Sequence, residues 1–350
     1  MSLTNAPELT PERREFYERI DTRSITPLWT VLSSVVTPEP KSACQSHLWH
    51  YDDLRKFLIE AGGLITAKEA ERRVLVLENP GLRGKTSITT DLYAGLQLVT
   101  PGESAPAHRH SQSALRLVLE TDEGAHTTVN GERTPLKYGD FVITPPWSWH
   151  DHGNDGDGPV IWLDGLDLPM VSLFDASFAE ELGVDQQEIT RVSGDSLARY
   201  AANMLPVGYE ARGQASPVFN YPYDRARSAL ETLKAQGEID PCHGIKLQYV
   251  NPVDGGPAMP TISTFLQLLP KGFRSVSYRS TDATIFAALE GKGTTTIDGK
   301  AYDWGPRDIF VVPSWKGVFH EAEDESVLFS FSARAAQEKL GYFRERRGNG

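Results

Sequence analysis

The stretch that decides the fold reads PGESAPAHRH (101–110) and, after an apolar run, YGDFVITPPWSWHDHGN (138–154). Alternate residues of a β-strand point to the same face, so His108 and His110 can address one point. His150 can reach that point from a neighbouring strand. Three imidazoles that converge inside a barrel form a site for a transition metal. The stretch therefore predicts a metal site made by these three histidines.

Glycines anchor both histidine groups at a fixed spacing. The first group reads G-x5-H-x-H from Gly102, and the second reads G-x5-P-x4-H-x3-N from Gly139. These spacings resemble the two motifs of the cupin family, with Trp147 where the second motif usually has Gly. The usual first motif also carries a Glu four or five residues after its second histidine, where this chain has Ala114 and Leu115. The site is therefore predicted to consist of three histidines without a carboxylate.

The sequence around the motifs resembles a narrower group than the cupins in general. The segments HRHSQSALRLVLE (108–120) and PPWSWHDHGN (145–154) resemble gentisate 1,2-dioxygenases and their salicylate and 1-hydroxy-2-naphthoate relatives. The resemblance implies an Fe(II) cofactor. It also implies a reaction in which dioxygen opens the ring of a small aromatic 2-hydroxy acid between the carboxylate-bearing and hydroxyl-bearing carbons. With gentisate (2,5-dihydroxybenzoate) the product would be maleylpyruvate.

Two alternatives to a gentisate dioxygenase stay open at this stage. One is a salicylate or 1-hydroxy-2-naphthoate 1,2-dioxygenase, because one side chain near the ring can change selectivity. The other is a non-enzymatic cupin binding protein that has kept its histidines. Oxygen consumption with the ferrous protein separates any dioxygenase from a binding protein.

The chain contains an internal repeat. LQLVTPGESAPAHRHSQSALRLVLE (96–120) lines up with LQLLPKGFRSVSYRSTDATIFAALE (266–290), and TTVNGERTPLKYGDFVITPPWSW (127–149) lines up with TTIDGKAYDWGPRDIFVVPSWKG (295–317). Many short strands at this spacing are typical of a closed antiparallel barrel or jelly roll. The expected fold is an all-β-dominated bicupin, with two antiparallel β-barrel or jelly-roll domains, an N-terminal helical arm and a helical connector.

The second copy lacks the metal ligands. Tyr278 and Ser280 stand where the first copy has its H-x-H pair, and His320 falls two residues beyond the place of the third histidine. One imidazole cannot hold a first-row metal alone. The expected stoichiometry is therefore one Fe(II) per chain, in the first barrel only.

The expected organisation has four parts. They are a helical arm (1–70), the metal-binding barrel (71–173), a helical connector (174–245), and the second, metal-free barrel with a C-terminal tail (246–350). Within the arm, a helix is expected from Tyr51 to Ala61, with Gly62-Gly63 as its end. Within the connector, helices are expected over ASFAEELG (176–183) and YDRARSALETLKAQG (223–237).

Composition excludes several classes of partner. The formal net charge is -12 and no basic run occurs, which argues against a nucleic-acid partner. No stretch of 18 apolar residues occurs, so no membrane span is expected. The two cysteines, Cys44 and Cys242, lie far apart and suggest a reducing compartment, so a cytoplasmic location is expected. The resemblance also implies a homo-oligomer, which is expected to be a tetramer.

Candidate substrate-binding residues are mostly cationic. Arg116 lies six residues after the second histidine, an even count, and a guanidinium can grip a carboxylate with two bonds. The alternative for Arg116 is a structural position on a solvated face. By resemblance, Arg72, Arg73 and Gln97 line the substrate pocket. Alternation along a strand lets only one of the two adjacent arginines point inward, and the sequence does not say which.

His152 and Asp164 are the remaining polar candidates. His152 shares the face of the third histidine and can exchange a proton with the substrate hydroxyl or contact the oxygen. Its alternative is a fourth ligand or a supporting role. The resemblance places Asp164 against the hydroxyl para to the metal-bound one, whereas Asp-Gly is also ordinary turn chemistry. Tyr93 and Trp149 are candidates for packing on the substrate ring, and core packing is their alternative.

Overall fold

The computed structural model describes residues 9–211 and 213–348. Contacts divide the chain into two compact units, Met1–Lys41 and Ser42–Gly350. None of the described helices is both long and apolar enough to cross a membrane.

The first unit holds two helices, α1 (Pro11–Asp21) and α2 (Leu28–Val35). Thr10 caps α1, because its hydroxyl accepts a hydrogen bond from the amide of Arg13. The indole Nε1 of Trp29 donates to the hydroxyl of Tyr17 at 3.0 Å and so joins the two helices.

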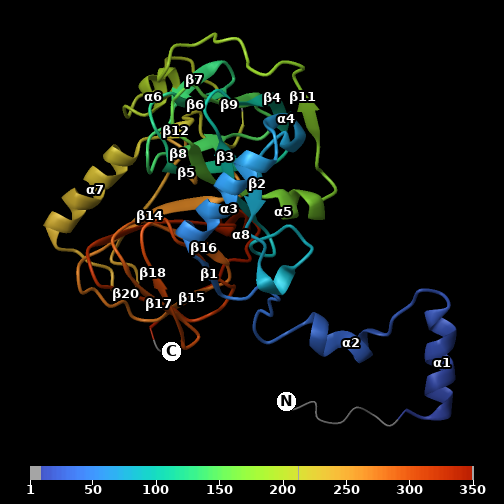
Figure 1. Ribbon diagram of the computed structural model, residues 1–350. Helices are drawn as coiled ribbons and strands as arrows, with labels where there is room; N and C mark the ends of the chain where they lie inside the picture. The colour runs from blue at the N-terminus through green and yellow to red at the C-terminus, as the bar shows by residue number, and fades with distance from the viewer. Residues whose placement is uncertain (1–8, 212, 349–350) are drawn as a thin grey trace. The chain divides into compact units, whose positions relative to one another are not determined.

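The second unit contains two antiparallel barrels of two sheets each, and Figure 1 shows the first in teal and green and the second in orange and red. The strands of the first barrel are β2 (Val74–Val76), β3 (Tyr93–Val99), β4 (Ser104–His110), β5 (Ala114–Glu120), β6 (Ala125–Val129), β7 (Glu132–Pro135), β8 (Phe141–Thr144), β9 (His150–Asn154), β10 (Val160–Leu166), β11 (Ala179–Glu181) and β12 (Asn220–Tyr221). Their sheet orders are β12-β8-β5-β10-β3-β2 and β11-β4-β9-β6-β7.

The second barrel repeats this arrangement. Its strands are β1 (His47–Trp49), β13 (Ile245–Gln248), β14 (Ser263–Leu269), β15 (Tyr278–Ser280), β16 (Thr284–Glu290), β17 (Gly293–Ile297), β18 (Lys300–Trp304), β19 (Ile309–Val312), β20 (Val318–Ala322), β21 (Ser326–Ser332) and β22 (Glu345–Arg347). Their orders are β1-β19-β16-β21-β14-β13 and β18-β17-β20-β15-β22. The all-β-dominated fold of two antiparallel barrels is confirmed.

Two helices of 14 residues, α3 and α7, and several short ones complete the unit. They are α3 (Tyr51–Leu64), α4 (Ala67–Ala70), the 3-10 turn η1 (Pro80–Leu82), α5 (Leu168–Leu173), α6 (Asp195–Tyr200), α7 (Tyr223–Gln236) and α8 (Arg334–Lys339). The expected end of α3 at Gly62 is wrong, because the helix continues to Leu64. A Cβ on Gly62 would lie 3.1 Å from the side chain of Leu98, so this glycine serves close packing against β3.

The expected helix over 176–183 is also wrong. That segment forms the short strand β11, which pairs with β4 between Ala179 and His110 and between Glu181 and His108. The edge of β4 offers unpaired backbone groups, and an extended segment satisfies them where an isolated helical turn would not.

Each barrel takes one strand from the other repeat. Strand β1 precedes the first barrel in sequence but pairs with β19 of the second barrel, and β12 precedes the second barrel but pairs with β8 of the first. The repeat therefore extends upstream of the barrels, as β1-α3-β2 and β12-α7-β13. The arm was expected to end at residue 70, whereas the contact division falls after Lys41. Strand β1 and helix α3 therefore belong to the second unit.

Helix α3 is bound to both barrels by four side chains. The amide of Tyr51 donates to Asp308 of the second barrel at 2.8 Å. The Tyr51 hydroxyl donates to Glu120 at the end of β5 in the first barrel, also at 2.8 Å. Arg55 grips the same carboxylate with two bonds of 2.7 and 2.6 Å.

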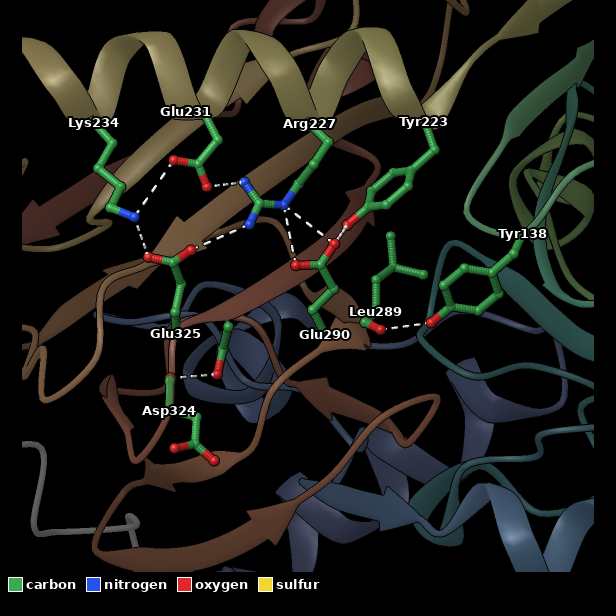
Figure 2. A network of polar contacts seen from close by, with 10 residues as sticks. Tyr138, Tyr223, Arg227, Glu231, Lys234, Leu289, Glu290, Asp324 and Glu325 are labelled. Carbon is green, nitrogen blue, oxygen red and sulfur yellow. Dashed lines mark hydrogen bonds and ion pairs between the residues drawn. The ribbon is translucent and has the colours of Figure 1, made fainter.

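Helix α7 repeats these contacts with the barrels exchanged. The amide of Tyr223 donates to Asp140 of the first barrel at 2.9 Å, and its hydroxyl donates to Glu290 of the second at 2.5 Å. Arg227 contacts both oxygens of Glu290 at 3.1 and 3.0 Å. Figure 2 shows Tyr223 and Arg227 on α7 directed at Glu290. The same Asp, Tyr, Arg and Glu positions thus tie the two barrels together twice.

We expect Glu290→Gln to lower the free energy of unfolding by about 1–3 kcal/mol, because it removes a charge-assisted bond to Arg227. Asp324→Asn is the matched control, since the Asp324–Lys271 pair is exposed on both sides and should contribute under ~1 kcal/mol. Urea unfolding of the two variants measures the difference. Equal losses would show that the contact of α7 with the second barrel does not depend on this carboxylate.

Candidate metal centre

Two adjacent strands bring three histidines together. His108 and His110 lie on β4, and His108 pairs directly with His150 at the start of β9. A register shift in β4 before His108 sets this pairing. One nitrogen from each of the three rings lies within 4.8 Å of the others. His150 is fully buried, whereas the other two rings are half-buried.

The other nitrogen of each ring is held by the backbone. Each Nδ1 lies within hydrogen-bond distance of a carbonyl two residues away in the chain. These carbonyls belong to Pro106 at 3.1 Å, Gln112 at 3.0 Å and Ser148 at 2.9 Å, for His108, His110 and His150 respectively. A carbonyl only accepts, so the Nδ1 atoms of His110 and His150 carry the proton and their Nε2 atoms keep the lone pair. At His108 the guanidinium of Arg72 contacts Nδ1 as well. The Nε2 of His150 is buried without a partner in the described chain, as expected of a nitrogen that awaits a ligand.

The charge state of the rings also fits a metal. Burial, together with the charge of Arg72, lowers the pKa of His108 to about 3. Burial and the charge of Arg116 lower the pKa of His110 to about 4, and burial holds the pKa of His150 well below its usual value. Neutral imidazoles suit iron, zinc, copper or nickel. Within residues 9–211 and 213–348 this is the only cluster of three or more His, Cys, Asp or Glu side chains that could hold a metal ion. The structure therefore fits one transition metal.

An arginine and an aspartate are buried side by side next to the histidines. Arg116 on β5 pairs in register with Asp164 on β10, and its Nε lies 3.5 Å from the carboxylate. Arg116 also donates to the hydroxyl of Thr144 at 2.6 Å, and Trp162 donates its indole N–H to Asp164 at 2.9 Å. Burial raises the pKa of Asp164 to about 6, and the charge of Arg116 opposes that shift. Arg116 remains a cation at neutral pH, although burial lowers its pKa to about 10.

His152 stands on the same face of β9 as His150. Its Nδ1 lies 2.9 Å from the hydroxyl of Thr127, and its ring packs against Trp162 with centroids 5.2 Å apart. The ring centroid is 5.7 Å from that of His150. His152 is not one of the three clustered rings, so the geometry favours a neighbouring role over a fourth ligand.

The structure separates the two adjacent arginines. Arg72 contacts the carbonyl of Pro106 and the ring of His108, so it faces the histidine cluster. Arg73 instead forms two bonds with Glu103, at 2.8 and 2.9 Å. Arg73 is thus occupied by a structural ion pair, and the expectation that it contacts substrate is not supported by its position.

Tyr93 and Gln97 lie on β3, whose register places Gly95 opposite Asp164 and Gln97 opposite Trp162. A Cβ on Gly95 would lie 2.8 Å from the hydroxyl of Tyr93, so this glycine makes room for the tyrosine. Burial raises the pKa of Tyr93, and the charge of Asp164 adds to the shift. Both side chains therefore border the face that carries Asp164.

Trp149 does not lie in the site. The guanidinium of Arg109 lies 4.6 Å from the ring centroids of both Trp147 and Trp149, on the face opposite the histidines. Arg109 also pairs with Glu180 of β11. The candidate role of Trp149 in packing on a substrate ring is wrong, because alternation along the chain directs it outward with Arg109.

Sequence reasoning missed three residues that support the site. Thr127 holds His152, Thr144 holds Arg116, and Trp162 contacts both Asp164 and His152. A period of two in IWLDG already places Trp162 on the face of Asp164, so that signal was available. The two threonines come from other strands, and only the pairing register brings them in.

Comparisons with known proteins agree with this geometry. Residues 95–166 match the family model described as "Cupin domain". The chain is 62% identical to gentisate 1,2 dioxygenase 1 of Aquipseudomonas alcaligenes, over 99% of this chain and 100% of that protein. The chain belongs to the gentisate 1,2-dioxygenase family.

Two other relatives have lower sequence identity but also match over nearly the whole chain. The chain is 34% identical to 5-aminosalicylate 1,2-dioxygenase of a Comamonas species, over 97% of this chain and 92% of that protein. The crystal structure of salicylate 1,2-dioxygenase from Pseudoaminobacter salicylatoxidans, as an adduct with gentisate, superposes with a TM-score of 0.92. That match has 34% identity and covers 100% of this chain and 98% of the other. The resemblance seen in the sequence is therefore confirmed.

We expect metal analysis of the purified protein to give one transition metal per chain. His150→Ala should lose that metal, because only two imidazoles, both half-buried, would remain to bind it. His320→Gln is the matched control: it changes a buried histidine of the second barrel, can keep the bond with Thr295, and should leave the metal content unchanged. Two tightly bound metals per chain, or equal loss in both variants, would contradict the assignment.

Proposed function

We propose that this chain is a gentisate 1,2-dioxygenase that converts gentisate and dioxygen to maleylpyruvate. Fe(II), one per chain, would be held by His108, His110 and His150 in the first barrel. The observation that carries the proposal is a cluster of three neutral imidazoles facing a buried Arg116–Asp164 pair. The full-length identity of 62% to a gentisate dioxygenase supports it.

When bound, ferrous iron supplies the electron-transfer chemistry that lets dioxygen react with an aromatic ring. Three neutral ligands leave its charge at +2, which favours a substrate that presents a carboxylate and a hydroxylate. A triad with one carboxylate would lower that charge to +1. The absence of a Glu at 114 and 115 therefore suits an ortho-hydroxy acid.

The substrate carboxylate would be held by Arg116, with Arg72 as a second cation. Arg116 is 4% exposed, so its attraction for an anion is little screened by water. Its Nε has no hydrogen-bond partner within the described residues, and a carboxylate oxygen would satisfy it. Thr144 fixes the guanidinium from the other side. The protein carries -12 overall, so these local cations must attract the anion against the global field.

His152 would accept a hydrogen bond from the substrate 2-hydroxyl. Its pKa is held well below the usual value, mainly by burial and then by Arg116, so the ring is neutral and its free nitrogen can accept a hydrogen bond. Thr127 and Trp162 fix its orientation.

Asp164 would select gentisate among the ortho-hydroxy acids. Its carboxylate is buried and accepts one bond from Trp162, which leaves room for the 5-hydroxyl of gentisate as a donor. Salicylate lacks that hydroxyl. Tyr93 and Gln97, which border the same face, would pack against the ring.

The test of this function is oxygen uptake by the ferrous protein with gentisate, salicylate and 1-hydroxy-2-naphthoate. We expect one dioxygen consumed per gentisate, with both oxygen atoms in the product, and much slower uptake with the other two acids. Faster turnover of salicylate or of the naphthoate would reassign the substrate within the family. No uptake with any of them would leave a binding protein.

Arg116→Ala should weaken gentisate binding about tenfold to hundredfold, since a charge-assisted contact of roughly 1.5–3 kcal/mol is lost. Iron content should stay at one per chain, because Arg116 is not a ligand. Arg133→Ala, which removes a half-buried arginine paired with Asp155 in the same barrel, is the control. Anaerobic titration followed by absorbance measures Kd, and an unchanged Kd for Arg116→Ala would remove this residue from the pocket.

Asp164→Ala should lower kcat/KM for gentisate and leave that for salicylate unchanged or higher. A site built around a substrate hydroxyl can reject the analogue without it by up to ~10⁴. Removing the acceptor abolishes that preference. Parallel losses on both acids would make Asp164 a structural support for Arg116.

We also propose a homotetramer in the cytoplasm. Both cysteines, Cys44 and Cys242, are free and buried, which suits a reducing compartment. Light scattering of the purified protein gives the number of chains directly, and a monomer would contradict the tetramer.

A further inference from the structure

The second barrel keeps a polar interior at the position where the first barrel has its site. Gln267 on β14 occupies the repeat position of Gln97 on β3, and His320 on β20 occupies that of His152 on β9. The hydroxyl of Thr295 lies 2.8 Å from His320 Nδ1, as that of Thr127 lies 2.9 Å from His152. The loss of the metal ligands therefore left the surrounding polar frame in place.

One cation in this interior makes no direct ion pair within the described residues. Lys246 on β13 is paired in register with Gln267, and its ammonium lies 4.7 Å from the ring centroid of Phe265 and 6.0 Å from that of Phe286. No ion pair or hydrogen bond of that ammonium occurs within residues 9–211 and 213–348. Burial, with the nearby charge of Arg334, lowers the pKa of Lys246 to about 8, and the charges of Asp282, Asp240 and Glu345 oppose that shift. The ammonium is thus stabilised at a distance but has no direct partner.

Two of the other cations that line this cavity have partners. Arg334 pairs with Asp282 at 3.1 Å, and Lys316 at the rim pairs with Asp298 at 2.8 Å. Tyr278 donates its hydroxyl to Glu345 at the edge of the barrel, and that carboxylate keeps its charge. The remaining rim cation, Arg279, also lines the cavity. Within the described residues, no carboxylate contacts the ammonium of Lys246 directly.

Gln267 supplies an unused donor beside this cation. Its side chain is fully buried, and neither its amide nitrogen nor its oxygen has a hydrogen-bond partner in the described chain. A buried amide without partners is costly, and native proteins place a ligand or water there. Cross-strand neighbours in register have Cβ atoms about 5 Å apart, so an ion between the two side chains can contact both.

The size of the cavity decides what fits. Its free volume is about 20 Å³, which holds roughly one particle the size of a water molecule. An aromatic acid is excluded at that volume. A water molecule would satisfy Gln267 but would leave the charge of Lys246 unbalanced.

We propose that the second barrel binds one small monovalent anion, of the size of chloride, between Lys246 and Gln267. The anion balances the ammonium, accepts the amide N–H of Gln267 and is enclosed by the rings of Phe265 and Phe286. Its role is to stabilise the barrel that carries no metal. The site is independent of the ring-cleaving reaction, so neither proposal depends on the other.

The first test is thermal unfolding of the full-length protein, with chloride replacing gluconate at constant ionic strength. We expect a saturable rise in Tm of about 2–5 °C for the natural chain. Lys246→Met should abolish that rise. Lys292→Met, which removes an exposed lysine of the same barrel, should keep it. A flat Tm for the natural chain, or the same rise in Lys246→Met, would overturn the proposal.

A second variant keeps the test decisive if Lys246→Met folds poorly. Gln267→Glu places a carboxylate beside Lys246 and so supplies the negative charge within the chain. We expect it to be at least as stable in gluconate as the natural chain is in chloride, and to lose the chloride response. A Gln267→Glu protein that is destabilised and still responds to chloride would contradict a balancing anion.

Crystals soaked in bromide locate the ion directly by anomalous scattering. The expected peak lies between Lys246 Nζ and Gln267 Nε2 in the natural chain and is missing in Gln267→Glu. No peak there would mean that only water fills the cavity. A peak that persists in Gln267→Glu would mark an adventitious ion only, and either result rejects the site.

Discussion

The site depends on one constraint, the fixed orientation of three imidazoles by backbone carbonyls two residues away. Each carbonyl holds the Nδ1 proton of its ring and so leaves Nε2 free, and the pairing of His108 with His150 brings the nitrogens together. The acceptor of each bond is a backbone carbonyl, which cannot rotate away as a side-chain acceptor could. The cluster is therefore pre-formed by the strands themselves, and a metal that binds it need not order the ligands first.

The second barrel contributes to that rigidity, although its described residues hold no cluster of three metal-ligating side chains. Its Asp308 holds the first residue of α3, and α3 in turn holds Glu120 through Tyr51 and Arg55. Glu120 ends β5, the strand that carries Arg116. The contacts of α7 with Asp140 and Glu290 complete the exchange in the other direction. The two barrels are thus bound into one structure by the same set of interactions used twice.

Much of this could be predicted from the sequence, because the motifs carry geometry with them. The glycine-anchored spacings placed the three histidines, alternation placed His152 and turned Arg109 outward, and the repeat predicted a second barrel. Alternation could not choose between Arg72 and Arg73, because both precede the first residue of β2 at Val74.

Other features depend on contacts between distant segments, which local patterns do not record. The pairing of β1 with β19 joins residues about 260 positions apart. The segment 176–183 has a helical composition but lies along the edge of β4, and that tertiary contact determines its conformation. Thr127 and Thr144 enter the site only through strand register.

The most direct test of the account is a crystal structure of the ferrous protein with gentisate, prepared without oxygen. The account predicts one iron per chain on the Nε2 atoms of His108, His110 and His150, with the gentisate carboxylate against Arg116 and the 5-hydroxyl against Asp164. Iron in the second barrel, or gentisate with its carboxylate turned away from Arg116, would contradict it.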